Sequence, residues 1–393
     1  HFLFIIMLGR QTSKTLYKNV VRNNRRSMSL LFQQQQAIKH FYSTEANHSH
    51  VKADAKAIDS TIGYVLSLNA RNMPYANALK STHQHFNWSF TTLKRHVEAF
   101  ACGVIEIGLR QGDRLGMIQG ANAENFVALL GCAKIGATLV QFPEVKTAKD
   151  LTRFIELFRP RVLMLPTKLG KTNYLNMLYE VIPEFEKGAF SVPVKSKRFP
   201  FLKQILLTDE RVAPQEGTVR FKDILVYGPF GYYENPLRRL AMTIDKDTPA
   251  LVLLDGSDPN KSTPYVFSHK NLLNAGAAVA LSLELKQGER VLVPKYLDAP
   301  FGSILANFAS FTSGASVVYP KEEYDVSSTV QSLAVDKVAV LFAQPNELQE
   351  IASSKDLSQY DFSTLRAIVT EDSISEATLS AVTSAFPNVR IVK

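Results

Sequence analysis

A helical apolar stripe followed by short apolar strands constrains the fold of this chain more than any other feature. In "FTTLKRHVEAFACGVIEIGL", Leu93, Val97, Phe100, Val104 and Ile107 recur at alternating spacings of four and three, the pattern of one buried helix face. "DRLGMIQG" is then typical of a strand, "NAENFVALLGCAKIG" of a second helix and "ATLVQFP" of another strand. This βαβ order predicts a parallel sheet covered by helices.

The ends of these two helices carry residues that favour helix termini. Thr91 or Thr92 can cap the start of the first helix, and Gly108 suits its carboxyl end. Asn122 lies near the expected start of the second helix, and Gly136 follows its end. We therefore expect both helices to begin and end close to these residues.

The alternation of strands and helices weakens between residues 167 and 245 and resumes at Leu251. The weaker region mixes Pro, Gly, aromatic and basic residues, which favours surface excursions. Near the end, Ser373 and Glu376 have the spacing of a capping box before another helical pattern. The predicted domain limits are residues 45–245 and 246–393, preceded by a separate segment of residues 1–44.

Residues 1–44 differ from the rest of the chain in charge. The whole chain has a net charge of +9, and this segment holds seven basic residues and no acid, so the remainder has 9 − 7 = +2. Such a nearly neutral body argues against nucleic-acid binding. A basic segment rich in Arg, Ser and Gln is typical of a mitochondrial presequence, with a solvated basic tail as the alternative. Its basic residues are Arg10, Lys14, Lys18, Arg22, Arg25, Arg26 and Lys39.

Apolar runs and cysteines limit the location and the kinds of site. No apolar run reaches the roughly 20 residues needed to cross a bilayer, so we expect a matrix protein, or one peripheral to the matrix face of the inner mitochondrial membrane. The chain has two cysteines, Cys102 and Cys132, both in apolar helical patterns. This count excludes a disulfide framework and a Cys-based zinc site. No metal site is predicted.

The order of these segments resembles that of the adenylate-forming superfamily, which includes acyl-CoA synthetases and firefly luciferase. The block from Trp88 to Pro143 is similar to the family's N-terminal block, and "VAVLFAQPNELQEI" is similar to its strand that ends in Pro-Thr before a helix. The resemblance covers roughly residues 61–393. It implies an α/β fold with two packed αβαβα subdomains and largely parallel sheets, without the family's C-terminal lid domain.

The stretch "LDGSDPNKSTPYVFSH" aligns with the family's nucleotide loop, Tyr-Thr-Ser-Gly-Thr-Thr-Gly-x-Pro-Lys-Gly-Val-x-x-Ser-His, but departs from its chemistry. Phosphate loops need close backbone N–H groups and a cation. Here two carboxylates replace hydroxyls, a proline removes a donor and a threonine replaces the lysine. Each carboxylate would repel a phosphate 4 Å away by about 1 kcal/mol in water and roughly 4 at an effective dielectric of 20. The loop consists of Asp255, Gly256, Ser257, Asp258, Pro259, Asn260, Lys261 and Thr263.

Two alternatives would allow this loop to bind phosphate. Lys261 lies close enough in sequence to offset one carboxylate, and a metal ion bridging Asp255, Asp258 and phosphate would restore phosphate binding by the loop.

A second site also differs from the family pattern, because larger and acidic residues replace the family's Ser-Gly-Gly-Ala adenine and acyl loop. Glycine lets a ligand approach the backbone closely, and these side chains would crowd it. They are Thr370, Glu371, Asp372 and Ser373.

The sequence ends at "NVRIVK", just before the place where the family's Tyr-Gly-x-Thr-Glu motif would follow. The resemblance implies that the Mg²⁺-holding Glu of that motif, the ribose-binding Asp and the catalytic Lys of the lid would come later. Adenylation needs positioning and electrostatic stabilisation of the transferring group. We therefore expect no catalytic residue and no cofactor in this chain.

These departures lead to a prediction of function. We expect a non-catalytic accessory subunit of a large mitochondrial assembly, such as ATP synthase or a respiratory complex, with protein subunits as partners. One alternative is an ATP-dependent acyl-CoA ligase completed by another chain, which would use ATP, Mg²⁺ and CoA. The other is a non-catalytic sensor that binds fatty acid, CoA or adenylate in the old cleft.

Overall fold

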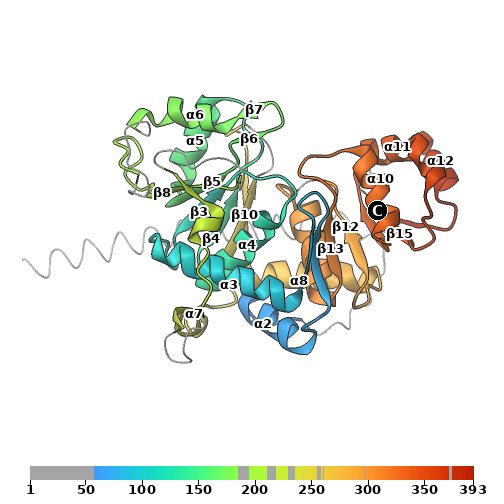
Figure 1. The fold of residues 1–393 in the computed structure, drawn as a ribbon, viewed down its shortest axis with the longest axis horizontal. Coiled ribbons are helices and arrows are strands. Elements are labelled where there is room, and N and C mark those ends of the chain that lie inside the picture. The colour runs from blue at the N-terminus through green and yellow to red at the C-terminus, as the bar shows by residue number, and fades with distance from the viewer. Residues whose placement is uncertain are drawn as a thin grey trace, which may run out of the picture. The chain divides into compact units, whose positions relative to one another are not determined.

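Two seven-stranded sheets organise the protein, for which we use a computed structural model (Figure 1). It describes residues 57–184, 194–209, 218–228, 235–254, 258–259, 261–295, 297–370 and 374–393. The predicted presequence, residues 1–44, lies outside the described residues, so that prediction stays open. No helix in the described ranges is both long and apolar enough to span a bilayer.

Sheet A takes its strands from both ends of the described chain. Its order is β16-β15-β14-β12-β13-β1-β2, and every neighbouring pair is parallel except the β1–β2 hairpin. The register pairs Leu79 of β1 with Val317 of β13. The strands are β1 (Asn77–Ser81), β2 (Phe86–Ser89), β12 (Arg290–Leu292), β13 (Ser316–Tyr319), β14 (Val340–Phe342), β15 (Ala367–Val369) and β16 (Arg390–Val392).

Sheet B contains the βαβ unit that the sequence predicts. Its order is β11-β10-β4-β3-β5-β8-β9, and only β10 and β11 pair antiparallel. Its strands are β3 (Arg114–Met117), β4 (Thr138–Gln141), β5 (Val162–Leu165), β8 (Gln204–Leu207), β9 (Val219–Arg220), β10 (Pro249–Leu254) and β11 (Pro264–Ser268). A small hairpin, β6 (Lys168–Leu169) and β7 (Thr172–Asn173), follows β5.

Helices cover both faces of each sheet, because successive strand residues point to opposite faces and are apolar on both. The central layer packs between the sheets, against Leu115 and Leu139 of sheet B and Val291 and Val317 of sheet A. It is made of α2 (Ile62–Asn72), α3 (Phe90–Glu106), α4 (Ala123–Ile135), α8 (His269–Ser282), the π-helix η3 (Phe301–Ala306) and α9 (Asn307–Ser313).

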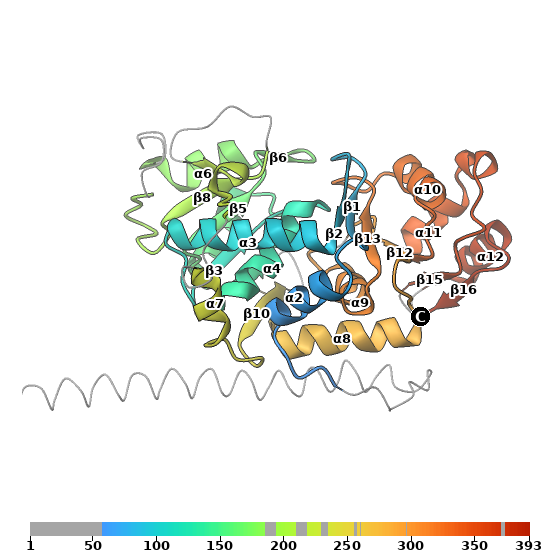
Figure 2. The same ribbon diagram turned by 60° about the horizontal axis from the view of Figure 1, so that its bottom comes forward.

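The outer faces are covered by two further groups of helices (Figures 1 and 2). Sheet B packs on α5 (Ala148–Phe158) and α6 (Tyr174–Val181). Sheet A packs on α10 (Val326–Val335), α11 (Pro345–Ala352) and α12 (Glu376–Ala385). The layers therefore run α, sheet B, α, sheet A, α, and the predicted α/β fold with largely parallel sheets is confirmed.

The chain crosses between the sheets more than once. The early strands β1 and β2 join sheet A, whereas the later strands β10 and β11 join sheet B. The predicted limit at residues 245 and 246 therefore does not coincide with a boundary between sheets, and the domain limits stay a prediction.

The region from residue 167 to 245 is not only a surface excursion. All four residues of β8 are buried, and the strand pairs parallel with β5, Leu163 opposite Ile205. Two short helical segments follow, η2 (Phe221–Ile224) and α7 (Pro236–Ala241). A four-residue apolar run between basic and proline-rich stretches carries too little periodicity to be recognised as a core strand.

Candidate functional site

The carboxyl ends of the parallel strands of both sheets meet at one place. The segment after β13 crosses to sheet B, where the backbone oxygen of Glu322 accepts a hydrogen bond from the Ala121 N–H after β3 at 2.9 Å. Glu323 Oε1 accepts another from the Gly170 N–H of the β6–β7 hairpin at 2.5 Å. In open α/β sheets, ligands bind outside the carboxyl ends of the strands. We call this junction the crevice.

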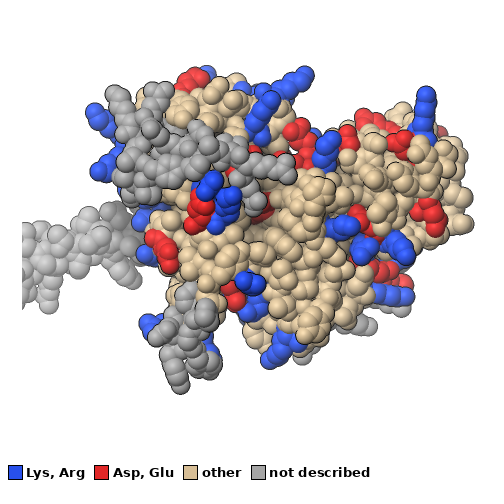
Figure 3. All heavy atoms as spheres, viewed as in Figure 1, with Lys and Arg blue, Asp and Glu red and all other residues tan. Residues whose placement is uncertain are grey.

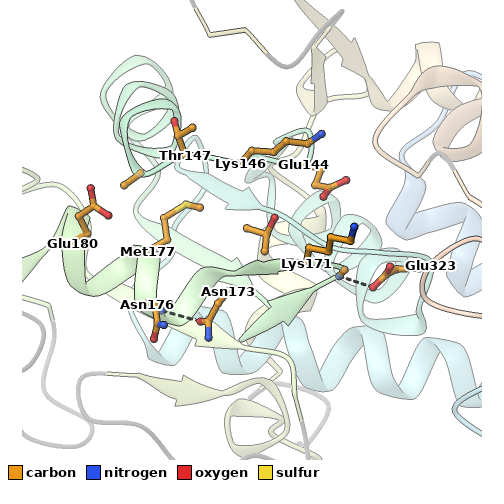
Figure 4. Close-up of a pocket in the computed structure, with 12 residues that line it drawn as sticks. Glu144, Lys146, Thr147, Lys171, Asn173, Asn176, Met177, Glu180 and Glu323 are labelled. Atoms are coloured by element: carbon orange, nitrogen blue, oxygen red, sulfur yellow. Dashed lines mark hydrogen bonds between the residues drawn. The ribbon is translucent and has the colours of Figure 1, made fainter.

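A pocket of about 840 Å³ opens at the crevice (Figure 4). It lies between the segment after β4, the β6–β7 hairpin and α6. Figure 4 shows Lys171, Glu144 and Glu323 grouped near one end, and Glu180 at the other. The lining residues are Glu144, Lys146, Thr147, Ala148, Gly170, Lys171, Thr172, Asn173, Asn176, Met177, Glu180 and Glu323.

The charges and helix starts of this pocket suit a polar, charged ligand. Lys146 and Lys171 are exposed and face a lining that also holds three carboxylates. Two helices begin here, capped by Thr147 and Asn173, whose side chains accept hydrogen bonds from backbone N–H groups at 3.1 Å and 2.9 Å. Lysine ammonium groups can form charge-assisted hydrogen bonds with phosphate or carboxylate groups.

A half-buried carboxyl from the segment after β12 interacts electrostatically with Glu144 of this pocket. Asp298 follows β12, and burial raises the pKa of its carboxyl; the charge of Glu144 raises it further, while that of Lys295 lowers it. Burial also raises the pKa of Tyr174, with smaller contributions from Glu144 and Asp298. Segments after β4 and β12 thus lie within electrostatic range of each other. The site residues predicted from the sequence do not include Glu144, Lys146, Lys171 or Asp298, although each follows a short strand.

The predicted nucleotide loop connects β10 to β11 at the same edge of sheet B. Asp255, Gly256, Ser257 and Asn260 lie outside the described residues. Asp258 Oδ2 lies 3.5 Å from Lys261 Nζ, and the Asp258 backbone oxygen accepts hydrogen bonds from the Lys261 and Ser262 N–H groups. Pro259 is buried and Thr263 lies just before β11. Lys261 therefore offsets the charge of Asp258.

The predicted adenine and acyl loop follows β15. The Thr370 N–H donates to Val392 O at 2.9 Å, and Thr370 is buried. Glu371, Asp372 and Ser373 lie outside the described residues. The predicted capping box is wrong, because Ser375 is the N-cap and accepts from the Thr378 N–H at 3.1 Å.

Figure 3 shows basic and acidic side chains interspersed over the viewed face rather than gathered in one basic field. In the part of the chain that the structure describes, no group of three or more His, Cys, Asp or Glu side chains could hold a metal ion. The two cysteines are free and buried, as predicted.

Comparison with known proteins gives the family context. The model of the AMP-binding enzyme family matches residues 66–393. The medium-chain acyl-CoA ligase ACSF2, mitochondrial, of Rattus norvegicus is 27% identical over 327 residues, 82% of this chain and 52% of the relative. The putative acyl-CoA synthetase YngI of Bacillus subtilis is 24% identical over 313 residues, 79% of this chain and 56% of the relative. The chain spans about half the length of these relatives.

Solved structures confirm the fold. A putative long-chain-fatty-acid CoA ligase from Rhodopseudomonas palustris superposes with a TM-score of 0.68 at 19% identity, covering 85% of this chain and 74% of the other. A luciferase-like enzyme from the mealworm Zophobas morio superposes with a TM-score of 0.66 at 13% identity, covering 86% and 74%. At such identities the likeness concerns the fold alone.

These comparisons correct the predicted function. The non-catalytic subunit of ATP synthase or a respiratory complex is wrong, as is the prediction that the chain is not an enzyme, because its relatives carry the names of acyl-CoA ligases. The prediction that the chain uses no cofactor rested on these two predictions, and the comparisons do not support it. The expected offset of one loop carboxylate by Lys261 agrees with the structure, in which Lys261 Nζ lies 3.5 Å from Asp258 Oδ2. The predicted protein partners stay untested.

Proposed function

Because the chain belongs to the AMP-binding enzyme family, we propose that it is the nucleotide- and acyl-binding part of an ATP-dependent acyl-CoA ligase. In this reaction a fatty-acid carboxylate attacks the α-phosphorus of ATP, which forms an acyl-adenylate and releases pyrophosphate. The thiol of CoA then attacks the acyl carbonyl carbon and releases AMP. The observation that carries the proposal is the family match over residues 66–393, together with relatives named ligases.

The relatives also indicate substrate and location. ACSF2 of several vertebrates is named a medium-chain ligase of mitochondria. We extend both properties to this chain, which has an acid-free basic segment at residues 1–44 that suits import. The acyl substrate is then a medium-chain fatty acid, and the location is the matrix or the matrix face of the inner membrane.

The chain's own residues would bind and orient the substrates at the crevice. Lys146 and Lys171 would hold phosphate groups of a cosubstrate by charge-assisted hydrogen bonds. The pairing of Asp258 with Lys261 lowers the repulsion that a polyphosphate meets at the β10–β11 loop. Mg²⁺ would enter with ATP as part of the substrate, since the described residues form no metal cluster of their own.

The test combines binding with the first half-reaction. A non-hydrolysable octanoyl-adenylate analogue at about a hundred times its dissociation constant should stabilise the chain by about 2.7 kcal/mol. Octanoate-dependent exchange between ATP and labelled pyrophosphate would report adenylate formation. No stabilisation by the analogue, ATP or octanoyl-CoA, together with no exchange, would overturn the proposal.

Two lysine variants test the role of the pocket. Lys171→Gln should weaken binding of the phosphate-bearing ligand about tenfold, because one charge-assisted contact is worth roughly 1.5 kcal/mol. Lys286→Gln makes the same charge change on an exposed side chain just before β12. This residue lies at the amino ends of the strands of sheet A, away from the crevice. This control should leave binding unchanged. Equal losses in both variants would show that only net charge matters.

A further inference from the structure

Glu322 joins the two carboxyl edges through both its backbone and its side chain. Its backbone oxygen accepts from the Ala121 N–H at 2.9 Å, and its Oε1 accepts from Asn122 Nδ2 at 3.0 Å. A Cβ atom at Gly120 would lie 2.5 Å from both Cγ and the backbone oxygen of Glu322. The loop after β3 therefore requires glycine at position 120, because the segment after β13 packs directly against the backbone of this loop.

The groups that surround Glu322 are mostly acidic. Asp209 after β8, Glu124 in the first turn of α4 and the adjacent Glu323 all disfavour a charge on its carboxyl. Each of these carboxylates has donors of its own, from the Thr167 N–H, from Gln84 Nε2 and from the Gly170 N–H.

The nearby cation does not offset this charge. Lys321 Nζ lies 3.4 Å from Asp325 Oδ1, so it is directed to another carboxylate. Among the ion pairs of the described residues, Glu322 has none. Its charged form is held only by neutral donors and is opposed by three carboxylates.

Burial raises the pKa of Glu322 to about 7, and the charges of Asp209 and Glu124 add to the effect. The hydrogen bond from Asn122 lowers it in part. A carboxyl with such a pKa is about half protonated at neutral pH, whereas an ordinary glutamate is fully ionised there.

We propose that Glu322 is a proton-dependent latch between the two sheets: its neutral side chain holds the carboxyl edges together across the crevice, and its ionisation loosens them. Below neutral pH the carboxyl packs against Gly120 and Asn122 without net charge. Above neutral pH a fourth negative charge joins Asp209, Glu124 and Glu323, and their repulsion acts directly on the contact between the β3 and β13 segments. The latch does not depend on which reaction the crevice performs.

The sign of the pH dependence follows from linkage. Between about pH 4.5 and 7 the folded state keeps a proton on Glu322 that the unfolded state has lost. The contribution of Glu322 to stability therefore falls as the pH rises through this window, and is constant above it.

The first experiment compares urea denaturation of the wild-type chain with Glu322→Gln, a neutral isostere, from pH 5 to pH 8. The variant should gain on the wild type as the pH rises, with a relative change in the unfolding equilibrium constant of about tenfold or more. Glu350→Gln, which alters an exposed glutamate of α11, is the control and should follow the wild type. Parallel curves for Glu322→Gln and the wild type would overturn the latch.

A second measurement needs no variant. The Ala121 N–H, which donates to Glu322, should exchange with solvent faster at pH 8 than at pH 6, after correction for the intrinsic rate, by about fivefold or more. The Val293 N–H, bonded to Val318 O at 3.1 Å within sheet A, is the internal reference. Equal changes at both amides would contradict a local opening at the crevice. Activity enters neither readout, so failure of the ligase proposal would leave both interpretable.

Discussion

Lys134 Nζ lies 3.0 Å from Glu98 Oε1, and this ion pair joins α4 to α3 inside the central helix layer. Burial lowers the pKa of Lys134, and Glu98 opposes that effect. Burial alone would raise the pKa of Glu98, but Lys134 and Lys94 outweigh it and lower the pKa. The two charges therefore depend on each other, because the Lys134 side chain is only 9% exposed.

Removing the carboxylate should leave an unpaired buried ammonium. We expect Glu98→Gln to lower the free energy of unfolding by about 3 kcal/mol at pH 7, since breaking one side of a buried pair costs more than the pair contributes. Lys94→Met is the matched control, because Lys94 Nζ also contacts Glu98 at 2.8 Å but is more exposed. It should cost about 0.5 kcal/mol. Similar losses in urea denaturation for both variants would contradict this account.

Gly103 of α3 lets η2 approach the helix backbone. A Cβ atom there would lie 1.7 Å from the backbone oxygen of Ile224, so one of the two segments must move. We expect Gly103→Ala to cost about 3 kcal/mol or more, at the upper end of overpacking effects. A Cβ atom at Gly63 in α2 would lie no closer than 3.3 Å to Lys134, so Gly63→Ala should change stability by less than about 1 kcal/mol. Thermal denaturation of the two variants would compare them directly.

The sequence predicts local structure well where helix ends carry strong signals. Asn122 caps α4 and Gly136 ends it with φ of 72°, as expected from the residue types. The start of α3 is missed by two or three residues, because Ser89 rather than Thr91 or Thr92 accepts from the Thr92 N–H. Several hydroxyl residues in succession make the cap ambiguous from sequence alone.

Long-range pairing and charge pairing are what the sequence could not supply. Leu79 pairs with Val317, and nothing local in either strand specifies so distant a partner. The crevice likewise depends on strand order, which brings Glu323 to Gly170. The sequence indicated that Lys261 could offset one of the two loop carboxylates, but the turn geometry was needed to show that it approaches Asp258. The sequence predicts which residues follow strands, and the topology decides which of them meet.

Arg366, just before β15, contacts the residue that precedes β12 and the end of α8. Its Nε and Nη2 donate to the two Glu289 oxygens at 2.8 Å each, and Nη1 donates to Leu283 O at 2.8 Å. A lysine cannot reproduce this planar fork, so Arg366→Lys should cost about 2 kcal/mol in urea denaturation.

Arg220 offers a matched control, because it forms a similar fork with Asp223 three residues away. That pair joins residues of one short segment and ties no separate elements together, so Arg220→Lys should cost less than Arg366→Lys. If Arg366→Lys were as mild as the control, the fork to Glu289 and the contact with the end of α8 would not contribute to stability.

His269 provides the last prediction, an acid-sensitive contact between α2 and α8. Its Nδ1 accepts from the Ile62 N–H at 3.2 Å, and its Nε2 is buried without a hydrogen-bond partner among the described residues. Burial lowers the pKa of His269 to about 4, against a small opposing effect of Asp245. Protonation therefore occurs more readily in the unfolded state, and the contribution of His269 to stability falls as the pH drops from about 6.5 to 4, by up to about 3 kcal/mol. Glu322 contributes to the pH dependence of stability with the opposite sign over nearly the same range, so the wild-type curve alone does not separate the two residues.

His269→Asn keeps an acceptor for the Ile62 N–H but cannot gain a proton. Its loss of stability relative to the wild type at pH 7 should therefore shrink towards pH 4.5. His85→Asn, at an exposed position with φ of 59° that asparagine tolerates, should follow the wild type at every pH. A deficit of His269→Asn that stays constant from pH 7 to pH 4.5 would show that folding does not lower the pKa of His269.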